Sequence, residues 1–249
     1  MSRIVVTGAS GVIGTVLSKA LADHELVPLD LPRGDVRRID LGRAFEGAET
    51  IVHLAWNSRS ESSGSGSIDP DNTLMCLRVY DAAVAAGGTR RVIMASSVHA
   101  DRYREWSGPG LLSATDVPWP DSPYGANKVL MESLGRHFAS AYGLDVICLR
   151  FGGVNTYNLK PTDPAELSVW LTHEDCEAVV RRCAEADVVP GRFIVMYAVS
   201  DNERPLVELE NPLGWRPAPG RDGVGRPLPP PSPTFRNRLG RLRRRLSSV

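Results

Sequence analysis

Short runs of apolar and β-branched residues alternate with longer amphipathic segments along most of this chain. Six runs have the length and composition of buried parallel strands: Ile4–Thr7, Leu26–Leu29, Thr50–Leu54, Arg91–Ala95, Asp145–Arg150 and Phe193–Met196. A shorter strand is predicted at Val36–Ile39. Segments with helical spacing of apolar residues lie between them, at Val12–Ala22, Asn72–Ala86, Tyr124–Tyr142 and Glu174–Ala186. This alternation predicts an α/β fold with a doubly wound parallel sheet and right-handed crossovers.

The segment between the first strand and the first helix carries three glycines spaced G-x-x-G-x-x-G. Glycines there permit a tight turn and a close approach of the backbone to a pyrophosphate, and the free N–H groups of the following helix attract the anion. We therefore predict a Rossmann-type fold that binds NAD or NADP. The predicted contacts in this turn are Gly8, Ser10, Gly11, Val12, Ile13 and Gly14.

Residues at the carboxyl ends of the next strands complete the predicted cofactor site. Asp30 follows the second strand, where a carboxylate accepts hydrogen bonds from ribose hydroxyls and repels a 2′-phosphate, so NAD is expected over NADP. Arg33 lies close enough to receive a 2′-phosphate, which leaves NADP open. Four further contacts are expected after the strands at 36–39 and 50–54, with the first two beside the adenine: Asp40, Leu41, Leu54 and Ala55.

Three residues have the chemistry and positions of a catalytic set. Tyr124 and Lys128 are four residues apart on a predicted helix, so they share a face. A lysine charge lowers the pKa of a phenol, and such a tyrosine can act as a general base toward a substrate hydroxyl. Lys128 could also hold the nicotinamide ribose. Ser97 follows the fourth strand, where it could bind the reacting oxygen, whereas Ser96 is expected to face the backbone.

Composition and charge describe the rest of the chain. The formal net charge of the 249 residues is zero, but from Arg216 onward there are nine arginines and one aspartate. We expect one domain over 1–220, with its substrate-binding part mainly in 151–215, and a disordered Pro/Arg-rich tail over 221–249. The segment 59–67 is expected to be a mobile loop. We expect the tail to be exposed to solvent rather than bound to nucleic acid.

Other partners and locations are limited by what the sequence contains. Neighbouring residues in His173–Cys176 point to different sides of a helix, so we expect no metal there, and Thr172 is expected to cap that helix. The four cysteines lack zinc-like spacing and are expected to be reduced. No apolar run has membrane-spanning length, and we expect a cytoplasmic protein without a membrane partner. A homo-oligomer is left open.

With these motifs the chain resembles the extended short-chain dehydrogenase/reductase family, also called the NAD-dependent epimerase/dehydratase family. The likeness is greatest to uronate dehydrogenases and related archaeal sugar dehydrogenases, and covers residues 3 to 220. It is carried by the glycine turn, the serine, tyrosine and lysine, and the segments Ser96–Ala100, Ser122–Lys128, Trp170–Cys176, Tyr197–Asn202 and Leu213–Pro217. The resemblance implies NAD as cofactor, Asn72 beside it, and a sugar-like substrate contacted by Ser97, Val98, His99 and Gly153. For His99, packing is the alternative.

Departures from that family affect the expected substrate. Val98, Gly153 and Ala165 stand where those dehydrogenases carry an asparagine, a serine and the arginine that grips the sugar carboxylate. Lys160 could supply a charge, but not the two-pronged contact of a guanidinium. We therefore expect a less polar or neutral sugar-like substrate rather than a simple uronate. If the reaction is also shared, a cyclic hemiacetal is oxidised to a lactone.

Two other functions remain open beside that of an NAD-dependent oxidoreductase that transfers a hydride between its substrate and NAD. One is an epimerase or dehydratase that uses bound NAD transiently. Dehydratases of this family place acidic residues where this chain has Val98 and His99, which disfavours a dehydratase. The other is a non-catalytic NAD-binding sensor or scaffold, against which stands the presence of Ser97, Tyr124 and Lys128 together.

Overall fold

The computed structural model describes residues 1–58, 61 and 67–219, so the predicted tail and most of the predicted loop at 59–67 lie outside the described residues. The strands are β1 (Arg3–Thr7), β2 (Glu25–Leu29), β3 (Thr50–His53), β4 (Arg91–Ser97), β5 (Asp145–Phe151) and β6 (Phe193–Ala198). The helices are α1 (Val12–Ala20), α2 (Leu41–Ala44), α3 (Pro70–Ala85), α4 (Pro123–Tyr142), α5 (Pro164–Ser168) and α6 (His173–Glu185). Three 3₁₀ turns are η1 (Val98–Ala100), η2 (Tyr103–Glu105) and η3 (Pro190–Arg192).

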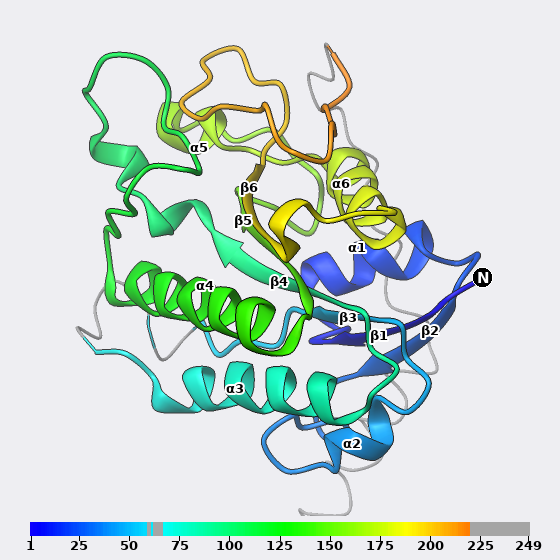
Figure 1. Cartoon of the computed structure of the whole chain (residues 1–249). Coiled ribbons are helices and arrows are strands. Elements are labelled where there is room, and N and C mark those ends of the chain that lie inside the picture. The colour runs from blue at the N-terminus through cyan, green and yellow to red at the C-terminus, as the bar shows by residue number, and fades with distance from the viewer. Residues whose placement is uncertain (59–60, 62–66, 220–249) are drawn as a thin grey trace, which may run out of the picture.

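The strands form one parallel sheet in the order β2-β1-β3-β4-β5-β6, which confirms the predicted Rossmann-type α/β fold. Helices α1 and α6 pack together on one face, and α2, α3 and α4 cover the other (Figure 1). Each face has its own apolar core, and the central strands are almost continuously buried because both faces are covered. The strand order reverses between β1 and β3, where ligands bind in sheets of this kind.

The predicted strand at 36–39 is wrong, because these residues form turns. The backbone N–H groups of Arg38 and Ile39 donate to the carbonyl of Asp35. The carbonyls of Val36 and Ile39 accept from the guanidinium of Arg78, at 3.0 and 2.9 Å. A side chain from α3 thus satisfies groups that a neighbouring strand would otherwise have to satisfy, and β2 remains the edge of the sheet.

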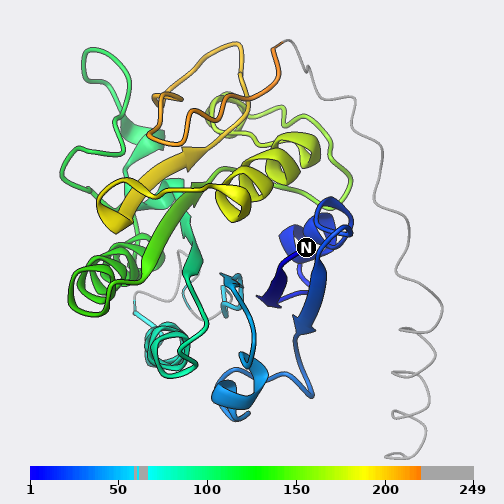
Figure 2. The same ribbon diagram turned by 45° about the vertical axis from the view of Figure 1, so that its right-hand side comes forward.

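A third apolar cluster lies beyond the carboxyl ends of the strands. Its buried members come from segments far apart in the chain: Val98, Tyr103, Leu112, Val169, Tyr197, Val199 and Val207. The segment 101–121 and the chain after β6 meet here, since Leu112 and Val207 form a β-bridge, and both segments run over the same end of the molecule as α5 (Figure 2). The segment 98–121 therefore packs against 151–215, the part in which the sequence analysis expects the substrate to bind.

Local signals place the helices as expected at several points. The Thr172 hydroxyl accepts from the N–H of Asp175, which confirms the predicted cap of α6. Cys176 and Cys183, seven residues apart on α6, are both fully buried in the core. Within the described parts of the chain, no helix combines the length and the apolar character needed to cross a membrane.

Gly152 offers a test of this packing. A Cβ built on Gly152 would lie 1.9 Å from the carbonyl oxygen of Val169, whereas one on Gly153 would meet nothing within 4 Å. We expect Gly152→Ala to lower the free energy of unfolding by about 1–3 kcal/mol, because the backbone must move apart. Gly153→Ala is the matched control and should change it little. Denaturant unfolding measures both, and equal losses would contradict the close packing seen here.

Candidate functional site

A groove runs across the carboxyl ends of β1 and β3. Two adjoining cavities, of about 630 and 530 Å³, make up this groove and share Gly8, Gly11, Leu54 and Trp56 in their walls. Gly8 has φ +70°, and a Cβ there would lie 2.6 Å from the N of Ala55. The turn after β1 therefore needs glycine at this position for both its backbone conformation and its contact with the chain after β3.

The groove fits a dinucleotide. Gly11 caps α1 without a side-chain hydrogen bond, so the N-terminal N–H groups of α1 remain available to a phosphate. The residues predicted to contact the cofactor in this turn, and Leu54 and Ala55 after β3, all lie in the walls of the two cavities: Gly8, Ser10, Gly11, Val12, Ile13 and Gly14.

Asp30 lies in the wall of the second cavity, as expected for a ribose contact. Its two carboxylate oxygens accept from the backbone N–H groups of Ser10 and Leu31, at 2.6 and 2.7 Å, which fixes the carboxylate beside the glycine turn. The arginine in this cavity wall is Arg37, not Arg33. Hydrogen bonds to Asp35 and Asp71 raise the pKa of Arg37, and the two carboxylates compensate its positive charge. A 2′-phosphate would therefore meet carboxylates on most sides.

Three predicted cofactor residues are placed elsewhere. Asp40 accepts from the N–H of Arg43 and caps α2, and Leu41 is buried in the second core, so neither lines the groove. Their expected position depended on the strand at 36–39, which does not form. Asn72 is fully buried and exchanges hydrogen bonds with the backbone of Asn57, so it holds the chain after β3 rather than lining the cavity.

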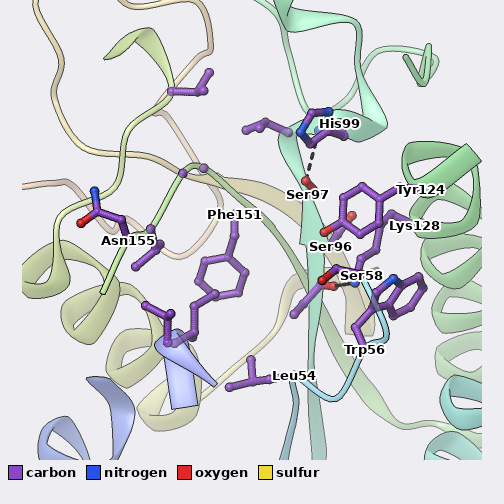
Figure 3. Close-up of a pocket in the computed structure, with 18 of the residues that line it drawn as sticks. Leu54, Trp56, Ser58, Ser96, Ser97, His99, Tyr124, Lys128, Phe151 and Asn155 are labelled. Carbon is purple, nitrogen blue, oxygen red and sulfur yellow. Dashed lines mark hydrogen bonds between the residues drawn. The ribbon is translucent and has the colours of Figure 1, made fainter. Parts of the chain in front are cut away.

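Ser97, Tyr124 and Lys128 meet in the wall of the first cavity (Figure 3). Ser97 ends β4, and the other two residues lie on the first turns of α4. The Ser97 hydroxyl lowers the pKa of the Tyr124 phenol, but the larger effect of burial leaves that pKa raised. The sequence predicted the proximity of these groups, but predicted a lowered pKa for Tyr124.

Lys128 is held by two contacts that the sequence did not indicate. Its Nζ donates to the carbonyl of Ala95 at 2.7 Å and lies 3.4 Å from the ring centroid of Trp56. Burial lowers the pKa of Lys128 to about 8. The Trp56 indole is fixed in turn, because its Nε1 donates to the buried carboxylate of Glu61 at 2.9 Å.

The predicted substrate residues also lie in the first cavity. His99 and Val98 follow Ser97 in η1, and Gly153 lies across the cavity after β5. The Nδ1 of His99 is 2.8 Å from the carboxylate of Asp121, which leaves Nε2 as the ring nitrogen without that partner. The ring packs edge-on against Tyr124, with centroids 5.7 Å apart.

A buried polar network lies behind the catalytic strand. Ser96 does not face the backbone as expected, because its hydroxyl donates to Glu132 on α4. Arg150 on β5 donates to both oxygens of Glu132, at 3.0 and 2.9 Å, and to Asp101 at 2.7 Å. Tyr197 on β6 also donates to Asp101. The network joins three strands, α4 and the segment after η1.

At the far end of the cavity the structure places two charged residues that the sequence analysis missed. Arg104 in η2 and Glu166 in α5 line it and form an ion pair with an N–O distance of 3.0 Å. Ala165 packs against the third apolar cluster and does not line the cavity, and Lys160 pairs with Glu203. The two residues lie in separate short elements, 62 residues apart, so no local spacing in the sequence pointed to this pair.

Comparisons with known proteins agree with this geometry. The family model described as NAD dependent epimerase/dehydratase family matches residues 4–170. An L-arabinose 1-dehydrogenase (NAD(P)(+)) of Haloferax volcanii is 35% identical, over 87% of this chain and 96% of that protein. A uronate dehydrogenase of Agrobacterium fabrum is 29% identical, over 94% and 92%.

Solved structures have the same fold. The crystal structure of uronate dehydrogenase from Agrobacterium tumefaciens has a TM-score of 0.73 at 24% identity, covering 97% of this chain and 89% of that one. A point mutant of that enzyme complexed with NAD gives the same TM-score. The predicted family and cofactor are thus confirmed: the chain belongs to the NAD-dependent epimerase/dehydratase family and is an NAD-dependent enzyme of the extended short-chain dehydrogenase/reductase type.

Proposed function

We propose that this protein is a dehydrogenase that oxidises a carbinol carbon of a sugar-like substrate with NAD. The observation that carries the proposal is the meeting of Ser97, Tyr124 and Lys128 in one cavity wall, next to the groove that fits the dinucleotide. The chain also matches two sugar dehydrogenases over most of their length. Oxidation at a cyclic hemiacetal, which would yield a lactone, is the reaction that the name of the arabinose enzyme favours.

Each residue has a distinct part in this reaction. Tyr124 takes the proton from the substrate hydroxyl, and Ser97, in the same cavity wall, holds the same oxygen. Lys128 lies on the same face of α4, with its Nζ 5.4 Å from the ring centroid of Tyr124, where it can hold the nicotinamide ribose. When bound, NAD supplies the acceptor for the hydride that leaves the carbon.

The epimerase and the non-catalytic sensor are less well supported. The first cavity has a volume of about 630 Å³, and the nicotinamide half of the cofactor would share this volume with the substrate. The remaining space suits a monosaccharide better than a nucleotide sugar. A sensor would have no need for Ser97, Tyr124 and Lys128 in contact range of one another. Production of NADH from a panel of free sugars distinguishes these functions from that of a dehydrogenase, since neither alternative reduces NAD with turnover.

Removing the phenolic oxygen of Tyr124 tests the mechanism. Tyr124→Phe keeps the ring and should lower kcat by about 10²–10⁴-fold while leaving NAD affinity nearly unchanged. Tyr142→Phe, at the exposed end of the same helix, is the matched control. Steady-state assays of NADH formation and calorimetric titration with NAD measure the two effects. Activity of Tyr124→Phe within a few-fold of the wild type would refute the role proposed for Tyr124.

The second prediction concerns the choice of cofactor. NAD should bind more tightly than NADP, because Asp30 lies at the ribose end and Arg37 is already paired with two carboxylates. Asp30→Ala should reduce the difference between the affinities for NAD and NADP. Asp40→Ala should leave it unchanged, because Asp40 lies outside the groove. Calorimetry with both nucleotides measures the ratio, and an effect of Asp40→Ala as large as that of Asp30→Ala would support the original placement beside the adenine.

A further inference from the structure

Arg104 and Glu166 form an ion pair in the wall of the first cavity, with side chains 43% and 53% exposed. Arg104 and Glu166 are 62 residues apart, and each comes from a separate element that borders the cavity. The guanidinium carbon also lies 5.4 Å from the ring centroid of Tyr103, which is buried. Contacts on two sides restrict the rotation of Arg104, whereas most exposed pairs lack such support and contribute little.

A second carboxylate lies beside the same guanidinium. Asp163 Oδ1 is 3.7 Å from Arg104 Nη1. Asp163 is itself fixed, because it accepts from the backbone N–H groups of Ala165 and Glu166, both at 3.0 Å. One positive charge is therefore shared by two negative charges, and this group of three residues carries a net charge of about −1.

The other cationic side chains in the described walls of this cavity do not compensate the net negative charge of these three residues. Lys128 lies beside Tyr124 and is directed to the carbonyl of Ala95 and the ring of Trp56. His99 faces the carboxylate of Asp121. A substrate carboxylate would therefore have to displace Glu166 from Arg104 and lie near Asp163. A hydroxyl group can donate to Glu166 and accept from Arg104 without either cost.

We propose that Arg104 and Glu166 contact the substrate and determine specificity, selecting an uncharged sugar over a sugar acid. This inference rests on the proposed dehydrogenase function and gives its substrate class. Both residues bind through hydrogen bonds to sugar hydroxyls, and the pair rejects anions because its positive charge is already neutralised. The carboxylate of Glu166 therefore contributes to the selection against sugar acids. The lack of the polar side chains that the resembling dehydrogenases carry contributes as well.

Galactose and galacturonate are suitable probes, because they differ only in carrying a hydroxymethyl or a carboxylate group at C6. Glu166→Gln keeps the shape of the side chain and removes its charge, so Asp163, at 3.7 Å, is the one carboxylate of this group left beside Arg104, and a substrate carboxylate meets less repulsion there. We expect the ratio of kcat/KM for galacturonate to that for galactose to rise roughly tenfold, mainly through KM. Glu105→Gln is the matched control, since Glu105 is exposed, adjacent to Arg104 and outside the cavity wall, and the ratio should stay within twofold.

Arg104→Gln completes the cycle. The single variant should raise KM for galactose with little change in kcat, and in the double variant with Glu166→Gln the gain for galacturonate should disappear, because no guanidinium remains to receive the acid. A gain that persists without Arg104 would show that only the general field of Glu166 matters, and would overturn the proposed contact. Equal ratios in Glu166→Gln and the wild type would also overturn it.

The controls separate this inference from the proposed function. If the wild type binds NAD but reduces it with neither sugar nor with L-arabinose, the dehydrogenase proposal fails first. If galactose or arabinose is oxidised and the ratio does not respond to Glu166→Gln, only the present inference fails. Wild-type turnover of galacturonate that exceeds that of both neutral sugars would refute it directly. Calorimetric titration of every variant with NAD confirms that each has folded.

Discussion

The site depends on how closely α4 approaches the end of β4. A Cβ on Gly125 would lie 1.9 Å from the carbonyl oxygen of His99, so only glycine permits this contact. Because Tyr124 precedes Gly125, the same approach brings its phenol to Ser97, and one turn later Lys128 reaches the carbonyl of Ala95. One backbone contact thus places all the groups to which we assign chemistry. A larger residue at this glycine would separate two elements rather than disturb one side chain.

The buried network behind β4 holds this arrangement from the other side. Glu132 lies on α4 two turns from Tyr124 and accepts hydrogen bonds from Ser96 and Arg150. Burying these charges costs solvation free energy, and an apolar substitute can be at least as stable. The network instead fixes the positions of the elements that it joins. The bidentate contact between Arg150 and Glu132 has one geometry, so it holds α4 against β5. The bond from Arg150 to Asp101 holds the segment that carries Arg104 in a fixed position relative to Ser97. This network thus links α4, which carries Tyr124 and Lys128, to the segment that carries Arg104.

The difference between what the sequence predicted and what it missed follows from the range of the contacts. The glycine turn, Asp30, and the spacing of Tyr124 and Lys128 are set by neighbours in sequence, so pattern alone located them. The strand at 36–39 was wrong because Arg78, far along the chain, satisfies its carbonyls. Arg104 and Glu166 lie together only because the third apolar cluster joins 98–112 to 169–207. The sequence around an exposed charged residue has no local pattern that indicates a partner 62 residues away.

The charges of the groove are also distributed along its length in a way that suits its ligands. At the ribose end, Arg37 is neutralised by Asp35 and Asp71, and Asp30 remains to accept from hydroxyls. At the substrate end, carboxylates again outnumber the guanidinium. Between them lie the N–H groups of α1 and Lys128, whose pKa of about 8 leaves it charged at neutral pH. The N–H groups at the start of α1 favour a pyrophosphate beside them, and Lys128 lies next to Tyr124, whereas the hydroxyl-bearing groups that we propose at either end require hydrogen-bond partners rather than net charge.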